Sequence, residues 1–276
     1  MLKEGVGWRA IHGPEVAWST VYAHFRRWTK AGIFAELSQM LPWESTQESR
    51  VGAMDSTHVK VHRSGCNPAG GQAAQAIGTS RGGLNTKIHA IVADNGEPLA
   101  MSFTGGNNHD NPQAQGLIDA MDTEAGVGTL IADRAYDANA TREAIESAGC
   151  QACIPPKANR IAPATYDQAS FARRHVVENF WEVLKRLRRV STRYEKLKQS
   201  FEAVVHLAIL VQHLRGQFQS AQFRRASVFL NTPSIRMKFR CALAHRGRGG
   251  NASHPRQCIR QSGRRLLRAQ HRPFHG

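Results

Sequence analysis

Three acidic residues stand where a fold could bring their carboxylates together. Asp55 lies in the strand-like run 51–63, Asp133 ends the apolar run 127–133, and Glu178 lies in a segment of helical character. Hard divalent cations such as Mg²⁺ prefer oxygen ligands, and two such ions can activate an attacking oxygen and stabilise a leaving one. Two strands and a helix could therefore present a metal site for chemistry at phosphate groups.

The acids alone leave other interpretations open. Asp55 precedes Ser56 and Thr57 and could hydrogen-bond the local backbone, whereas Asp133 precedes Arg134 and could form a surface ion pair. Other acids are equally available, namely Asp94, Asp110, Asp119 and Asp137. A shared role for the first three therefore depends on the elements that carry them.

The segment 171–189, which carries the third acid, is predicted to be one helix. It has no Pro or Gly over 19 residues, and strong helix formers fill its second half. Arg174, Glu178 and Lys185 are spaced by four and then seven residues, which aligns them on one face. A second, apolar stripe can bury against a sheet and consists of Val177, Phe180, Leu184 and Leu187. A carboxylate held between two cations, on a helix that docks by its other side, suits a metal site that faces phosphates. The alternative is a solvated helix with ordinary ion pairs.

The hydrophobic pattern before this helix predicts a sheet built from both antiparallel and parallel strands. The expected strands are 51–63, 86–93, 98–104, 127–133 and 150–154. The expected helices are 111–122, 139–148 and 199–219. Residues 64–83 form a polar, glycine-rich loop whose length suggests a binding role. His109 and Asp110 lie in another polar loop and are given no role. The predicted fold class is α/β.

Residues 1–50 are predicted to form a small helical region. A helix at 20–31 ends near Gly32, and a short helix follows at 33–40. Two short helices around a glycine turn are compatible with a helix-turn-helix DNA-binding unit, but a helical cap on the main domain is favoured. Residues 1–7 show no pattern that predicts a partner, so the chain is expected to begin within a domain.

Positive charge is concentrated at the end of the chain. The formal net charge is +16, yet residues 223–276 hold 13 Lys or Arg and no acid, against 24 basic and 21 acidic residues in 1–222. The tail lacks sustained periodicity and is predicted to be disordered. It could attract any polyanion, nucleic acid included. No apolar run reaches transmembrane length, and no signal peptide is recognised.

The five cysteines favour reduced, cytosolic thiols, because an odd number in a long chain is not a disulfide framework. Cys150 and Cys153 have the spacing of a redox or zinc pair. No second Cys or His pair stands nearby at a matching spacing, so structural cysteines in a buried strand are the favoured interpretation.

Several stretches of the chain resemble the DDE transposases of bacterial insertion sequences, in the group called family five of the family-four-like superfamily. The matching stretches are MDST at 54–57, SRGGLNTKIHA at 80–90, IADRAYD at 131–137, RHVVENFWEVLK at 174–185, TRYEK at 192–196 and VHLA at 205–208. The motif at 174–185 is specific, since it places Arg, Glu and Lys at fixed spacing. Members of the family usually carry Tyr where this chain has Phe171.

The resemblance implies a ribonuclease-H-like core, in which a mixed sheet is flanked by helices. Asp55, Asp133 and Glu178 would be the catalytic carboxylates and would bind Mg²⁺ or Mn²⁺. Arg174 and Lys185 would contact DNA. A basic track could extend that contact through Arg186, Arg188, Arg189 and Arg193. The implied reaction is metal-dependent strand cleavage and strand transfer at the terminal inverted repeats of an insertion sequence. The implied partner is double-stranded DNA, bound by a homo-oligomer in the bacterial cytoplasm, at the nucleoid.

The expected organisation is a partial helical region at 1–50, a catalytic domain at 51–222 and a basic tail at 223–276. Relatives usually carry more helical, DNA-binding sequence before Trp8, and the tail matches no family pattern. The chain is therefore expected to be an N-terminally truncated copy with an atypical end. An inactive DNA-binding remnant is the alternative function, and a nuclease that cuts without joining is a third.

Overall fold

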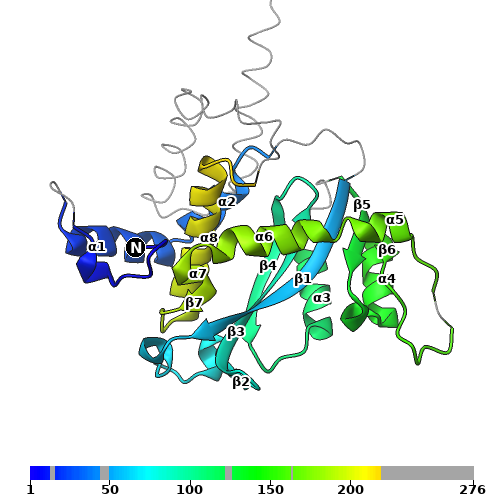
Figure 1. Ribbon diagram of the computed structural model, residues 1–276, viewed down its shortest axis with the longest axis horizontal. Coiled ribbons are helices and arrows are strands. Elements are labelled where there is room, and N and C mark those ends of the chain that lie inside the picture. Colours follow the sequence, from blue (N-terminus) through cyan, green and yellow to red (C-terminus); the bar gives the residue numbers. More distant parts are fainter. Residues whose placement is uncertain (13–15, 44–49, 122–125, 163, 219–276) are drawn as a thin grey trace, which may run out of the picture. The chain divides into compact units, whose positions relative to one another are not determined.

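The computed structural model describes residues 1–12, 16–43, 50–121, 126–162 and 164–218 (Figure 1). They belong to one unit, Met1–Gln222, while residues 223–276 form another. The prediction of a disordered tail at 223–276 lies outside the described residues. Within the described ranges, no helix is long and apolar enough to cross a membrane.

A mixed seven-stranded sheet forms the centre of the first unit. β1 (Arg50–Val61) pairs antiparallel with β3 (Gly83–Ala93), which pairs antiparallel with β4 (Pro98–Gly105). On its other side, β1 pairs parallel with β5 (Val127–Ala132), which pairs parallel with β6 (Gln151–Cys153). The predicted α/β class and mixed sheet are confirmed, and the strand order is that of a ribonuclease-H-like core.

Two short strands complete the sheet. β2 (Gly78–Ser80) pairs with β3, and β7 (Thr192–Arg193) pairs with the end of β1. The predicted loop 64–83 is thus partly regular, because it contains β2 and the 3₁₀ turn Ala73–Gln75. These additions lie at the end of β1 away from β5, where β3 and β7 are its neighbours.

Helices cover both faces of the sheet. They are α1 (Trp18–Lys30), α2 (Ile33–Gln39), α3 (Ala114–Ala120), α4 (Asn139–Ser147), α5 (Gln168–Ala172), α6 (His175–Lys185), α7 (Arg188–Ser191) and α8 (Lys198–Leu214). Neighbouring residues along a strand point to opposite faces. Ala53 accordingly joins the core formed with α6 and α8, while Met54 joins the core formed with α3 and α4. Figure 1 shows α6 crossing the strands, with α8 beside it at the left and α3 at the right of β1.

The N-terminal residues are tied to the same unit. Gly32 adopts a left-handed conformation (φ 72°) between α1 and α2. Ser38 Oγ of α2 lies 2.7 Å from His206 Nδ1 of α8. The prediction that residues 1–7 lack a partner is wrong, because the carbonyl oxygens of Leu2 and Lys3 accept hydrogen bonds from the amides that open α7. Leu2 also packs against the main core.

The predicted helix 171–189 is broken into three helices, α5, α6 and α7. Between α5 and α6, the amides of Arg173 and Arg174 bond to oxygens three residues back, which tightens the chain out of α-helical geometry. Between α6 and α7, Leu187 is extended (φ −90°, ψ 113°). Hydrogen bonds to the N-terminal segment replace helical ones there, and this tertiary cause leaves no mark on local helix propensity. The apolar stripe of the prediction is nevertheless buried.

The two cysteines with redox-like spacing have structural surroundings. Cys150 and Cys153 are both buried free thiols. Their Sγ atoms approach the carbonyl oxygens of Val127 (3.1 Å) and Asp167 (3.3 Å). Burial raises the pKa of each thiol, which disfavours the reactive thiolate. The favoured interpretation, structural cysteines, agrees with these contacts.

Candidate active site

Asp55 and Asp133 lie side by side on neighbouring parallel strands. The register pairs Met54 of β1 with Ala132 of β5, and each acid is the next residue along its chain. Adjacent strands lie about 4.8 Å apart, so the two side chains start from neighbouring backbone positions. Asp133 also begins a 3₁₀ turn, where its Oδ1 accepts a hydrogen bond from Ala135 N at 2.9 Å.

The environment of Asp55 is strongly electrostatic. Burial raises its pKa above the ordinary value because the charged carboxylate loses solvation. The negative charges of Asp133 and Asp110 also raise this pKa, whereas the backbone N–H of Ser56 and the guanidinium of Arg174 lower it. Three carboxylates are thus close enough to repel one another. A further cation would relieve that repulsion.

Arg174 links Asp55 to Glu178, the third predicted acid. Its Nη1 donates a hydrogen bond to Glu178 Oε1 at 2.6 Å, and its Nη2 lies 3.5 Å from Asp55 Oδ1. Arg174 precedes α6, and Glu178 lies in the first turn of that helix. The four-residue spacing therefore puts both side chains on the same side of the helix. The structure places Asp133 beside Asp55, with Glu178 one arginine away.

The donor set suits a hard divalent cation, because carboxylate oxygens are its preferred ligands. Asp55 and Asp133 supply them from adjacent strands, and the Glu178 side chain is 57% exposed. As the side chains stand, no three His, Cys, Asp or Glu residues in the described ranges form a ready metal-binding group. Arg174 lies between Asp55 and Glu178. Asp55 and Asp133 therefore fit a divalent cation, whereas Arg174 separates Glu178, the third predicted ligand, from them.

Asp110 is a fourth carboxylate at this place, and it was assigned no role from the sequence. Its Oδ1 accepts hydrogen bonds from Ser56 Oγ at 2.8 Å and Lys87 Nζ at 2.9 Å. His89 Nδ1 lies 3.6 Å from the same oxygen. Burial raises the pKa of Asp110, but the bonds from Lys87 and Ser56 more than offset that effect and lower it overall. The available signal was Lys87 itself, a charge within an apolar strand that needed a buried partner.

Lys185 faces β1, but it is already engaged there. Its Nζ donates hydrogen bonds to Thr57 Oγ1 at 2.6 Å and His58 O at 3.1 Å. Burial lowers the pKa of Lys185, and the charge of Asp55 partly opposes this shift. Lys185 therefore fixes α6 to the strand that carries Asp55. Arg186 is exposed and pairs with Glu182 of the same helix at 2.7 Å, so its DNA contact stays a prediction, as does that of exposed Arg188.

The burial of Arg189 and Arg193 corrects the prediction that both extend a DNA-binding track. Arg189 forms an ion pair with Glu195 and donates to Val6 O at 3.0 Å. Arg193 is fully buried and donates to Glu195 O at 2.9 Å and Thr86 Oγ1 at 2.6 Å. Burial lowers the pKa of Arg193 to about 10. Both guanidinium groups join parts of the fold and cannot reach DNA in this conformation.

Phe171, where the family usually has Tyr, packs edge-on against Tyr166 with ring centroids 5.6 Å apart. It packs against a small buried cluster of Val51, Ile131 and Cys153, which lie on β1, β5 and β6. An aromatic ring is therefore used for packing at this position.

The strand order defines a ribonuclease-H-like α/β domain. Within that class, the chain belongs to the transposase DDE domain family, which it matches over residues 46–212. This span includes Asp55, Asp133 and Glu178, and it covers the whole sheet.

A relative and two solved structures give the wider context. The chain is 40% identical over 134 residues to a candidate transposase for insertion sequence element IS6501 of Brucella ovis, a match covering 48% of this chain and 100% of the relative. It is also similar to a Mos1 transposase paired-end complex with the left transposon end, at 13% identity and TM-score 0.26, over 74% of this chain and 67% of that chain. A Mos1 mariner paired-end complex with Mn gives 14% identity and TM-score 0.27, over 76% and 64%. Likeness at this level adds nothing to the strand order described above.

Proposed function

We propose that the chain is the transposase of an insertion sequence, which cuts DNA at the terminal inverted repeats and transfers the cut strands to target DNA. The observation that carries this proposal is the pair Asp55 and Asp133 at adjacent strand positions, with Glu178 joined to Asp55 through Arg174. Membership of the transposase DDE domain family supports it.

The proposed cofactor is Mg²⁺ or Mn²⁺, held by Asp55, Asp133 and Glu178. Bound there, such an ion supplies activation of the attacking oxygen and stabilisation of the leaving oxygen. For Glu178 to join the strand pair, Arg174 has to release one of the two carboxylates it now contacts. Burial raises the pKa of Asp55, and the charges of Asp133 and Asp110 add to that effect. Both causes favour this exchange, because a dication stabilises several charged carboxylates at once.

The chain's other side chains position the reacting groups. Asp110 accepts a hydrogen bond from Ser56 and Lys185 donates one to Thr57, so β1 is fixed at the two residues that follow Asp55. Arg174, once released from a carboxylate, is placed to pair with a DNA phosphate, which suits a planar guanidinium. We propose double-stranded DNA, both element end and target, as the partner of a homo-oligomer at the bacterial nucleoid.

Strand cleavage with purified full-length chain tests the proposal. The substrate is a duplex that carries the repeats flanking the gene, with Mg²⁺ present, and products are resolved on denaturing gels. Asp133→Asn should lower the cleavage rate by about 100-fold or more, since preorganised charge at a reacting phosphate is worth that much. Asp119→Asn is the matched control, because Asp119 is exposed on α3 and bonds only Gln115 among the described residues.

The products separate this proposal from its alternatives. Joined strands in the wild-type reaction support transposition, and cleavage without joining supports a nuclease. Salt-sensitive DNA binding with no nicking, whether or not divalent ions are present, identifies a DNA-binding remnant. Full cleavage by Asp133→Asn would falsify the proposed metal site.

A further inference from the structure

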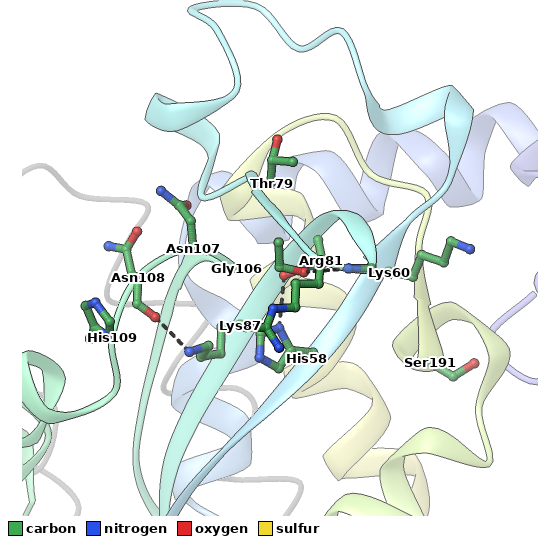
Figure 2. Close-up of a pocket in the computed structure, with 13 residues that line it drawn as sticks. His58, Lys60, Thr79, Arg81, Lys87, Gly106, Asn107, Asn108, His109 and Ser191 are labelled. Carbon is green, nitrogen blue, oxygen red and sulfur yellow. Dashed lines mark hydrogen bonds between the residues drawn. The ribbon is translucent and has the colours of Figure 1, made fainter. Parts of the chain in front are cut away.

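A basic pocket of about 800 Å³ opens beside the second half of β1. Figure 2 shows it enclosed by β1, the turn between β2 and β3, and the loop at 106–109. Its exposed cationic side chains are those of Lys60 and Arg81, and the rings of His58 and His109 add further donors. Among the described residues, no Asp or Glu lines it, so the pocket has the charge of an anion-binding site.

Lys87 lines the pocket, but its charge is already paired. Lys87, whose side chain is 7% exposed, donates to Asn108 O at 2.7 Å and pairs with Asp110 at 2.9 Å. This holds the 106–109 loop against β3 and uses the charge of the nearest acid. Within the described part of the chain, neither Lys60 nor Arg81 forms an ion pair. Their positive charges are therefore available to a ligand.

The backbone packs closely against side chains at two glycines in or beside the pocket walls. A Cβ on Gly106 would lie 1.3 Å from Asn85 Oδ1, and one on Gly78 would lie 1.8 Å from Asn107 Oδ1. Asn85 is buried, and its side chain contacts His58 Nδ1 at 3.0 Å and donates a hydrogen bond to Gly83 O of the β2–β3 turn at 2.9 Å. Its backbone O accepts a hydrogen bond from Gly106 N at 3.1 Å. Asn85 thus contacts all three walls, two through its side chain and one through its backbone oxygen. A pocket fixed in this way loses little conformational entropy when it binds a ligand.

The pocket adjoins the acid cluster. His58 follows Asp55 by three residues on β1, which is about 10 Å at the rise of a strand, and the odd spacing places its side chain on the other face of the sheet. The Lys87–Asp110 pair belongs to both places, because Asp110 also bonds Ser56 beside Asp55. Successive phosphates of a duplex strand rise by about 3.4 Å along the axis. A DNA strand cut at the acids would span this distance with a few nucleotides, and it would pass from one face of the sheet to the other at the part of β1 between Met54 and Lys60, which lacks a described strand partner on the β5 side.

We propose that this pocket binds the phosphate backbone of a DNA strand next to the cut site, with Lys60 and Arg81 as its contacts. The position of the cut rests on the proposed function, whereas the binding itself does not. The pocket is open and lined by short polar groups and cations, which suits a continuous polyanion whose sequence is not read. Its DNA comes from either the element end or the target.

Fluorescence anisotropy with the full-length chain in EDTA tests the proposal without any cleavage. The probes are two labelled duplexes of equal length, one with the repeat that flanks the gene and one of unrelated sequence. The double variant Lys60→Ala, Arg81→Ala should weaken binding about 10-fold near 0.1 M salt and lower the slope of log affinity against log salt by about 2. Lys60→Arg, Arg81→Lys keeps both charges and should restore most of the affinity.

The matched control removes two charges elsewhere. Arg26 and Lys30 are exposed on one face of α1, four residues apart, and the double variant Arg26→Ala, Lys30→Ala should cause a clearly smaller loss. Loss on both duplexes supports a site that also accepts target DNA, and loss on the repeat duplex alone assigns the site to the element end. Wild-type affinity in the pocket variant, or equal loss in both double variants, overturns the proposal. Either result leaves the cleavage test of Asp133→Asn untouched, so the two proposals fail separately.

Discussion

One strand, β1, carries two chemically opposite neighbourhoods. Around Asp55, burial raises the pKa of the carboxyl group, and the nearby carboxylates of Asp133 and Asp110 raise it further. Further along the same strand, His58 and Lys60 open into a pocket that no acid lines. The Lys87–Asp110 ion pair lies between them and contributes one charge to each side. A bound cation would reduce the repulsion among the carboxylates of the first neighbourhood, and a bound anion would neutralise the positive charges of the second.

This contrast suggests how the domain divides its work. Repulsion among partly buried carboxylates makes the acid end sensitive to divalent ions and to the exact set of acids. Exposed cations make the pocket sensitive to salt, since DNA binding by such groups releases counterions. The two ends should therefore respond differently to the same perturbation.

Removing divalent ions should separate the two ends most widely. In EDTA at constant ionic strength, we expect DNA cleavage to fall to background, because the carboxylates lose the ion that the reaction needs. Affinity for the same duplex should change by less than about threefold, because Lys60 and Arg81 contact phosphates directly. Gels and anisotropy on the same samples measure both. A joint loss of cleavage and affinity would contradict the division, since it would show one metal-dependent site.

Glu178 and Glu182 offer the next test, because they lie one helical turn apart on α6. Glu178 contacts Arg174 beside Asp55, whereas Glu182 pairs with Arg186 in solvent. Glu178→Gln should slow cleavage about 100-fold or more, and Glu182→Gln should stay within about twofold, as expected for an exposed ion pair. Single-turnover cleavage rates measure the difference. Equal effects would show that α6 supplies only general charge.

The acid end was largely predictable from the sequence, because its signals are local. Asp133 follows a buried parallel strand, and the spacing of Arg174 and Glu178 is helical, so each was placed by its own segment. The approach of Glu178 to Asp55 follows once α6 docks through its apolar stripe. Sharing of a metal ion by the three acids stays a prediction.

The basic residues were harder to place, because their burial depends on distant partners. Arg189 and Arg193 lie in a basic stretch of the kind that is usually exposed to solvent. The helix is interrupted at Leu187, however, and Glu195 accepts hydrogen bonds from both guanidinium groups. Lys87 and Asp110 meet only after β3 and β4 have paired. No local pattern distinguishes these charges from those that face solvent.

Arg193 tests whether a buried cation stabilises the fold at the end of β1 that borders the pocket. The register pairs it with Val61, and its Nη1 donates to Thr86 of β3. Arg193→Met should lower the free energy of unfolding by about 3 kcal/mol, since it leaves buried acceptors without their donor. Arg188→Met, at an exposed position nearby, should change it by less than about 0.5 kcal/mol. Urea denaturation measures both, and equal values would refute a structural role for Arg193.

His89 gives the smallest expected effect and lies at the boundary between the two ends. It pairs with Ser56 across β1 and β3, and burial lowers its pKa to about 4 from an ordinary 6.5. Asp110 raises that pKa, while Lys87 and His58 lower it, and Thr104 Oγ1 lies 2.8 Å from Nε2. The folded pKa is below the unfolded one, so the unfolded chain binds more protons between these two values.

Stability contributed by neutral His89 should therefore be fully present above pH 6.5 and lost as the pH falls towards 4. Between pH 7.5 and pH 5, we expect this residue to account for up to about 2 kcal/mol of the fall in unfolding free energy. His89→Gln should remove that part of the pH dependence. His206, whose pKa burial also lowers to about 4, should retain the rest. If His89→Gln kept the full pH dependence of the unfolding free energy, protonation of His89 would not contribute to it, because other groups would account for the whole fall in stability.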